Sequence, residues 1–403
     1  MLKTKIKYMN FRNLVLIYIL LIFFISPIAI PGEKVLKYPE KDPGGKFGTN
    51  IKRKLEDENY IIVKYIRKTE YTEYRNDYRN GISYIIIGDK IVNSTDSITI
   101  YGNNLIEIHF SSPITSLEKF FSGNRDGNAN NIGSVDLSHF DSSLVKSTVK
   151  MFEGCFGLES VNFSNFDSSL VTNMNSMFYF CFRLKSLDLS SFNTSLVANM
   201  DEMFFQCSRL QTLNVSNFDT SLVTDMRYMF YQCRELQSLD ISNFNTSSVT
   251  NMNNMFFECS KLQSLNLSNF DTSLVTDIHH MFSFCTELQS LDVSNFNTSL
   301  VTNMSNTFRD CLQLQSINLT NFNTSLVRDM QYMFKNCNQL KSLNLSNFKT
   351  SLVTNMEELF YGCNQLISLD ISNFDTTLVT NVKNMFYGLN LIKYINIYNN
   401  TIS

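Results

Sequence analysis

The stretch LQTLNVSNFDTSLVTDMRYMFYQC, residues 210–233, decides the fold because the chain restates it at a fixed interval. Two sets of phenylalanines keep a step of 26 residues, one from Phe152 to Phe386 and the other from Phe140 to Phe374. The nine cysteines keep the same step; they are Cys155, Cys181, Cys207, Cys233, Cys259, Cys285, Cys311, Cys337 and Cys363. A fixed period of this length is typical of a solenoid, in which each repeat forms one coil of a stack. Residues 26 apart then occupy one position in successive coils, and we call such a set a column.

One coil contains two patterns of apolar residues. The first fits one side of a helix of about three turns and consists of Val223, Met226, Met229, Phe230 and Cys233. The second is the alternation of apolar and polar residues over 236–244, which predicts a short strand with one buried face. We therefore predict an α/β repeat solenoid, a leucine-rich-repeat-like horseshoe of about ten coils of 26 residues. A parallel sheet would line one side and short helices the other.

Columns differ in how strictly they hold their residue type. The column of Val223 is valine in all ten coils, from Val145 to Val379. Another column varies freely and is predicted to face outward from the helix; it contains Ser176, Glu202, Tyr228, Asn254, His280, Asn306, Tyr332 and Glu358. Constant columns suit a packed core, and variable columns suit a solvated surface.

The motif MFYQC–x–x–LQSLDISNF–x–T–S–x–VT–x–M resembles the BspA-type leucine-rich repeat, the 26-residue repeat of bacterial surface proteins. The resemblance covers about 134–398 and recurs ten times. It departs from ordinary leucine-rich repeats at Phe244, which occupies the usual asparagine position, so a phenylalanine spine is expected to replace the asparagine ladder. The resemblance implies a cell-surface adhesin that meets host or neighbouring-cell surface proteins, matrix proteins or glycans.

The residues before and after the repeats are predicted to form further segments. Residues 1–32 have a basic start followed by the apolar run 14–30, which indicates a signal peptide, or a signal anchor if it stays uncleaved. Membrane contact is expected only in the second case. Residues 33–47 are rich in Lys, Pro and Gly and are predicted to be a linker, 134–398 the solenoid and 399–403 a C-terminal tail.

Residues 48–133 are predicted to form an N-terminal cap of mainly β structure that closes the open core of the first coil. Three β-branched and aromatic runs, at 60–66, 83–87 and 97–101, are expected to be its strands. Residues 104–123 resemble a degenerate repeat. Ile106-x-Ile108-x-Phe110 echoes the coil strand, and Phe120–Phe121 echoes Met151–Phe152.

No arrangement of residues in the sequence indicates catalysis, a cofactor or a metal. The cysteines are odd in number and lie one per coil on an inward column, so we expect buried free thiols, with disulfides between neighbouring coils as the alternative. The adjacent His279 and His280 face different ways, and no Cys-x-x-Cys pair or glycine-rich phosphate loop occurs. The net charge of −3 offers no basic field for nucleic acid. We therefore expect a protein that is not an enzyme and has no cofactor.

The candidate binding surface is an Asp/Asn column on the predicted strands. It consists of Asp188, Asn214, Asp240, Asn266, Asp292, Asn318, Asn344 and Asp370. Such monotonous polar rows favour weak multivalent contact with a repetitive partner over one tight ligand, because tight binding needs distinct anchors. We therefore expect a secreted or cell-surface binding protein. The alternative is a structural surface coat or spacer that has no discrete ligand.

Overall fold

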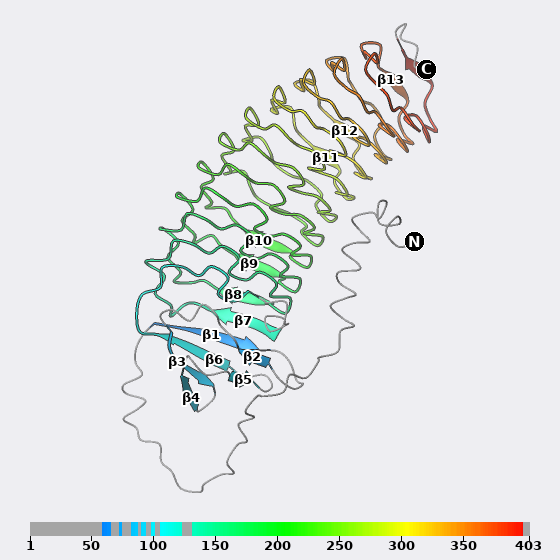
Figure 1. Ribbon diagram of the computed structural model, residues 1–403. Coiled ribbons are helices and arrows are strands. Elements are labelled where there is room, and N and C mark those ends of the chain that lie inside the picture. The colour runs from blue at the N-terminus through cyan, green and yellow to red at the C-terminus, as the bar shows by residue number, and fades with distance from the viewer. Residues whose placement is uncertain are drawn as a thin grey trace, which may run out of the picture. The chain divides into compact units, whose positions relative to one another are not determined.

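The structure is a computed structural model, and it describes residues 59–65, 72–74, 82–87, 90–93, 98–100, 105–122 and 131–397. All of these belong to the unit Asp57–Ser403. Figure 1 shows the described residues in colour. The predicted signal peptide, the linker, the start of the cap and the C-terminal tail lie outside the described residues. The strands are β1 (Tyr60–Tyr65), β2 (Thr72–Tyr74), β3 (Ile82–Ile87), β4 (Lys90–Asn93), β5 (Ile98–Ile100), β6 (Leu105–Phe110), β7 (Ile132–Asp136), β8 (Ser160–Asn162), β9 (Ser186–Asp188), β10 (Thr212–Asn214), β11 (Ser290–Leu291), β12 (Ser316–Ile317), β13 (Ser368–Asp370) and β14 (Tyr394–Asn396).

A mixed sheet, antiparallel from β4 to β7, precedes the coils and joins directly onto them. Its strand order is β4-β3-β6-β1-β7-β8. Strand β1 pairs antiparallel with β6 on one side and with β7 on the other, and β7 then pairs parallel with β8 of the next coil. The predicted strands at 60–66, 83–87 and 97–101 are confirmed as β1, β3 and β5. Because β1 covers the edge of β7, the first coil does not present a free strand at this end.

The degenerate repeat at 104–123 is only half a coil. Strand β6 pairs antiparallel with β1 and β3, so the expectation that residues 106–110 echo a coil strand is wrong. The second half does stack as a coil: the N–H of Phe121 donates to the carbonyl of Met151 at 2.9 Å, and the ring of Phe121 stacks on that of Phe152 with centroids 5.1 Å apart. Residues 105–110 instead satisfy their backbone groups within the antiparallel sheet.

The coils stack in parallel and in register. Leu213 of β10 pairs with Leu187 of β9, 26 residues earlier, and Leu369 of β13 pairs with Ile395 of β14. A second ladder of single parallel bridges runs without interruption from the pair Ser116 and Ser147 to the pair Asn355 and Asn381. The solenoid is therefore confirmed, but the predicted parallel sheet along one side is not continuous. From β8 onward the strands are only two or three residues long, and beyond β8 they form the separate pairs β9-β10, β11-β12 and β13-β14.

The predicted helices are wrong, because no α-helix occurs in the part of the chain that the structure describes. Residues 226–233 form consecutive turns, in which the N–H of Met229 donates to the carbonyl of Met226, three residues earlier. The N–H groups between these turns donate to the next coil, as that of Phe230 does to Met255 at 2.9 Å. Two residues of the segment, Tyr228 and Gln232, have left-handed backbone with φ of 56° and 57°. Bonding between coils thus replaces bonding along a helix axis.

The same geometry corrects the column that was predicted to face outward. Its residues are the first left-handed position of each coil, with φ between 51° and 60°. Ser176, Asn254 and Asn306 are only 0%, 6% and 5% exposed. Variation in this column therefore does not mark a solvated face.

The interior is one continuous apolar core built from the constant columns. Valine, methionine, phenylalanine, cysteine and leucine positions are buried in coil after coil, as Val249, Met252, Phe256, Cys259 and Leu262 show. The rings of the Phe152 column stack face to face at centroid spacings between 5.3 and 6.2 Å. Stacking neighbours bury what a single coil would expose, so stability is shared along the array.

Two polar ladders hold adjacent coils together beside this core. The residue before the Phe244 position is asparagine, and Asn243 donates its side-chain amide to the carbonyl of Ser216 in the preceding coil at 2.5 Å. An asparagine ladder therefore exists alongside the phenylalanine spine, and the expectation that the spine replaces it is wrong. Buried threonines form the second ladder: the hydroxyl of Thr272 donates to the carbonyl of Asn297 at 2.9 Å and accepts the N–H of Asn297 at 2.8 Å. These bonds satisfy turn backbone that would otherwise be buried without a partner.

Candidate binding surface

The structure places the predicted binding column on the exposed side of the coil strands. Asp188, Asn214 and Asp370 end β9, β10 and β13, and in each strand the preceding leucine points inward. The other members of the column, Asn266, Asp292, Asn318 and Asn344 among them, are exposed as well. The column thus forms one row along the strand face, which we call the Asp/Asn row.

Each member of the row also has a local structural task. The Oδ1 atom of Asp240 accepts the N–H of Ser242, two residues on, at 3.1 Å and the hydroxyl of Ser242 at 2.7 Å. Asn214 and Asn266 accept the corresponding N–H at 3.2 and 3.1 Å. Hydrogen bonds to the ionised form lower the pKa of a carboxyl group, and they hold the pKa of Asp240 below its ordinary value. The Oδ2 atom of Asp240 takes no part in these bonds, whereas both carboxylate oxygens of Asp370 are engaged, Oδ1 by the N–H of Ser372 and Oδ2 by the amide of Asn396.

Acidic and neutral residues alternate along most of the row. Aspartate stands at Asp188, Asp240 and Asp292, and asparagine stands between them. Because neighbouring coils are about 4.8 Å apart, this alternation keeps carboxylates about two coils apart and limits their repulsion. An amide also bridges to the adjacent carboxylate, as the Asn396 amide does to Oδ2 of Asp370 at 3.1 Å. The row therefore presents fixed negative charges at regular intervals on a hydroxyl- and amide-rich face.

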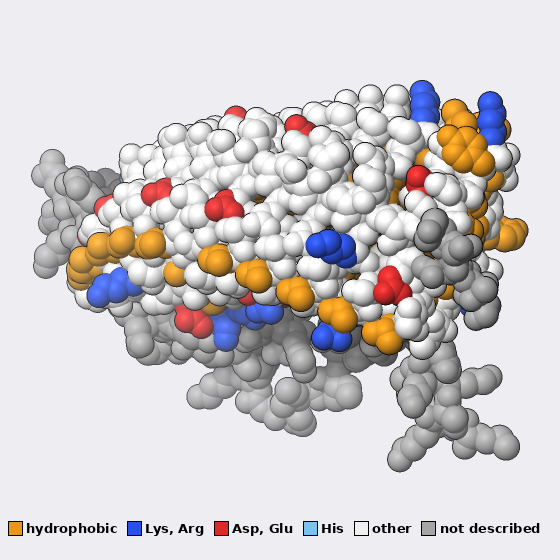
Figure 2. Space-filling model, turned by 90° about the horizontal axis from the view of Figure 1, so that it is seen from above, with side chains coloured by type: hydrophobic (Ala, Val, Ile, Leu, Met, Phe, Trp, Pro, Cys, Tyr) orange, Lys and Arg blue, Asp and Glu red, His pale blue; other side chains and the backbone are white. Residues whose placement is uncertain are grey.

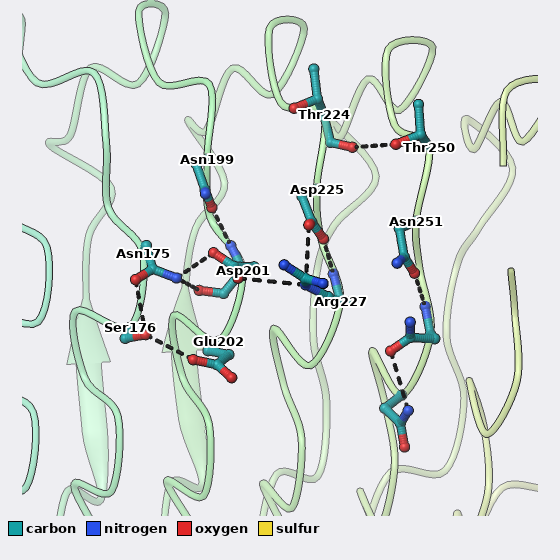
Figure 3. A network of polar contacts seen from close by, with 12 residues as sticks. Asn175, Ser176, Asn199, Asp201, Glu202, Thr224, Asp225, Arg227, Thr250 and Asn251 are labelled. Carbon is teal, nitrogen blue, oxygen red and sulfur yellow. Dashed lines mark hydrogen bonds and ion pairs between the residues drawn. The ribbon is translucent and has the colours of Figure 1, made fainter. Parts of the chain in front are cut away.

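The turn segments carry a second group of polar residues, which are engaged with one another (Figure 3). Ser176 donates its hydroxyl to Oε2 of Glu202 at 3.0 Å. Arg227 lies 3.1 Å from Oδ2 of Asp225 and 3.6 Å from Oδ2 of Asp201, one coil away. Burial raises the pKa of Asp225 and of Glu202. These contacts tie successive coils together, so the network stabilises the stack and is a poorer candidate for a ligand site than the Asp/Asn row.

The thiols and histidines show no arrangement for chemistry. All nine cysteines are buried and unpaired, and each donates to a phenylalanine carbonyl of the preceding coil, as Cys259 does to Phe230 at 3.2 Å. His279 pairs with Asp277 at 2.7 Å, whereas His280 lies against Ser283, and burial lowers the pKa of His280 to about 3. Within the described ranges no group of three or more His, Cys, Asp or Glu side chains could hold a metal ion. The same ranges contain no helix long and apolar enough to cross a bilayer.

One hollow near the C-terminal coils breaks the regularity and was missed by sequence reasoning. It lies at Gly362 and Gly388, in the column where Gln206 and Gln232 stand in other coils, and the rings of Tyr361 and Tyr387 flank it. A Cβ atom on Gly362 would come within 2.5 Å of Oδ1 of Asn336, so glycine keeps the hollow open. The signal in the sequence was that glycine stands in this column in two successive coils, whereas elsewhere in the column it occurs only at Gly154.

The stacked 26-residue coils and the regular polar row define a repeat protein of the solenoid class. A family model described as "Mycoplasma protein of unknown function, DUF285" matches residues 115–213, 206–316 and 279–397. The chain belongs to this family. The match falls on the same residues that resemble the BspA-type repeat and agrees with that resemblance.

Other comparisons add little. No curated protein matches the sequence. Among solved structures, a leucine rich cell surface protein from Faecalibacterium prausnitzii A2-165 is 18% identical, with a TM-score of 0.38; the alignment covers 83% of this chain and 97% of that chain. A TLR13–ssRNA13 complex is 15% identical over 71% of this chain and 55% of that chain, with a TM-score of 0.24. At such low TM-scores neither likeness supports an inference about this chain.

Proposed function

We propose that this protein is a secreted or cell-surface binding protein that uses the Asp/Asn row for multivalent contact with surface proteins, matrix proteins or glycans. The observation that carries the proposal is the row itself, an exposed series of Asp and Asn side chains that recurs once in every coil. The basic and apolar start of the chain supports export. Binding at many weak sites adds up along an array without any single strong anchor.

The charges of the row indicate what the partner carries. Carboxylates at Asp188, Asp240 and Asp292 favour repeated cationic or hydrogen-bond-donor groups. Because hydrogen bonds hold the pKa of all three carboxyls below the ordinary value, the row keeps its charge in mildly acidic surroundings. Contact of this kind weakens as salt is added.

The test replaces Asp188, Asp240 and Asp292 together by asparagine in the full chain. Asparagine occupies this column in the intervening coils, so the turns are expected to keep their hydrogen bonds and the coils their stability. Binding to a panel of immobilised matrix proteins and glycans is measured by biolayer interferometry. We expect a loss of at least about tenfold in apparent affinity, since each charge-assisted contact contributes about 1 kcal/mol or more.

A matched control replaces Arg183, Arg209 and Lys261, which lie outside the row, by glutamine. This control should bind as the unaltered chain does. If no member of the panel binds the unaltered chain, or if the row variant binds undiminished, the spacer alternative is favoured instead.

A further inference from the structure

A stripe of exposed leucines runs along the coils in a column separate from the Asp/Asn row. Figure 2 shows a line of separate hydrophobic side chains along the stack. Eight leucines of this column are between 37% and 50% exposed; they are Leu144, Leu170, Leu196, Leu222, Leu274, Leu300, Leu326 and Leu378. Leu352 is half-buried, and Ser248 replaces leucine in the fifth coil. Folding of the turn does not require leucine at this position, because Ser248 occupies it in the fifth coil.

Hydroxyl residues flank most of the stripe, and the carboxylates nearest to it are held by local hydrogen bonds, as Asp219 accepts the N–H of Ser221 at 3.0 Å. Serine precedes each leucine in most coils, and two residues after it comes a threonine whose hydroxyl donates to the previous coil, as Thr250 does to Thr224 at 3.2 Å. Lys146 and Arg328 are the charged residues in that threonine column. The leucines themselves offer only apolar surface, so the stripe favours an apolar partner.

The exposed apolar area of the stripe is large enough for a specific protein–protein interface. Half-exposed leucines in this number present on the order of 600 Å² of apolar surface, the upper end of what soluble monomers expose. Two such stripes facing each other would bury about 1,200 Å², which is the lower limit of a specific interface.

The spacing of the leucines selects the partner. Successive leucines are one coil apart, about 4.8 Å, because the coils are joined by β-type bonding. An α-helix repeats one turn about every 5.4 Å, which is longer than the spacing of the coils. Over the length of the stripe, the turns of a helix would therefore fall behind the leucines by about one position. Alternate residues of a single strand are about 6.6 Å apart and fit less well. A stack with the same rise keeps every leucine in contact, and a second copy of this chain provides it.

We propose that two copies of this protein associate side by side through their leucine stripes. The contact is self-complementary, as expected for a two-fold dimer. It leaves the Asp/Asn row of each copy uncovered, since the row lies eight residues earlier in every coil. Dimerisation is thus independent of the binding function proposed above and doubles the number of sites in one assembly.

The test is sedimentation equilibrium of the full chain and of a variant with Leu222, Leu274 and Leu300 replaced by serine. Serine occurs naturally at Ser248 in this column, so the coils should fold unchanged, which circular dichroism and thermal unfolding check. We expect the unaltered chain to be dimeric at micromolar concentration in both low and high salt. The variant should dissociate at least about a hundredfold more readily, because apolar contact is removed from both copies.

Three results would overturn the proposal. The first is an unaltered chain that remains monomeric at about 100 μM, well above the affinity expected of such an interface. The second is a dimer that persists undiminished in the leucine variant, which would place the contact elsewhere, for example in residues 1–56. The third is a monomer that binds phosphatidylcholine vesicles and loses that binding in the variant, which would assign the stripe to a lipid surface. The asparagine variant of the Asp/Asn row serves as the control and should dimerise normally.

Discussion

Raising the pH above 9 is expected to unfold the coils, because nine thiols are held protonated inside the core. Burial raises the pKa of Cys285 and of Cys363 to about 12 and raises the pKa of the other seven cysteines as well. In the unfolded chain a cysteine has a pKa of about 8.5. The folded state therefore binds these protons more tightly than the unfolded state does.

The direction and size of the effect follow from this difference. The contribution of the thiols to stability is complete below pH 8.5 or so and is lost as the pH rises toward the folded-state values. Above that pH each thiol lowers the free energy of unfolding by about 1.4 kcal/mol per pH unit, and nine thiols together lower it by about 12 kcal/mol per pH unit. Native proteins are stable by only about 5–15 kcal/mol, so cooperative loss of structure is expected near pH 10.

Circular dichroism against pH in the presence of a reducing agent measures this transition. Variants in which Cys259 and Cys285 are replaced by alanine serve as the comparison, since each substitution removes one titrating group and should make the pH dependence shallower. Replacement by leucine has a natural precedent at Leu389, which occupies the cysteine column in the last coil. A midpoint of chemical unfolding that stays constant between pH 7.5 and 10.5 would contradict buried thiols.

Replacing Phe256 by alanine is expected to destabilise the protein by about 3–5 kcal/mol, the usual cost of removing a buried phenylalanine. Phe256 is fully buried, and its ring stacks between Phe230 and Phe282 with both centroids 5.6 Å away. The substitution leaves a cavity in the middle of the spine and weakens the coupling of the coils on either side. Unfolding by guanidinium chloride, followed by circular dichroism, gives the change in free energy.

The matched control is Phe257→Ala in the adjacent position. Phe257 is half-buried and stacks on Tyr231 with centroids 4.6 Å apart, outside the spine. Its loss should cost about 1.5 kcal/mol or less, because most of the removed surface was not in the core. Equal losses for the two variants would show that the spine has no special place in stability.

The stack itself could be predicted because burial acts on every coil in the same way. Val223, Phe230 and Cys233 belong to columns that keep their residue type through nine coils, and all three residues are completely buried. Only in the last coil are the members of these columns partly exposed. The 26-residue period is what predicts the stacking, because a coil that cannot bury its own apolar face needs a neighbouring coil 26 residues away.

The helices were predicted wrongly because the spacing of inward residues does not determine backbone handedness. Met226, Met229, Phe230 and Cys233 point inward from consecutive turns as well as they would from a helix. The left-handed positions are occupied by Tyr228 and Gln232, residue types that rarely adopt that conformation, so local propensity pointed the other way. Bonding to the next coil overrides that propensity. Glycine at Gly154, Gly362 and Gly388 in the second left-handed column was the available signal.

The candidate surface was partly predictable for a different reason. Alternation along the strand identifies which side chains leave the core, so the exposure of Asp240 and its column follows from the buried leucine before it. The asparagine and threonine ladders were not anticipated, because the polar residues Asn243 and Thr272 look like ordinary turn residues until the neighbouring coil supplies their partners. The leucine stripe was not anticipated either, because the sequence alone did not distinguish its exposed leucines from the buried leucines of the core.

Counting reactive thiols in the native and unfolded protein tests the continuous core most directly. Ellman's reagent is added to the full chain at pH 8, first in buffer and then in guanidinium chloride. The stacked coils predict no reaction within minutes in buffer and nine thiols released by denaturant, because every cysteine is buried and hydrogen-bonded to the coil before it. Rapid reaction of several thiols in the native protein would contradict a sealed core and with it the stacking of the coils.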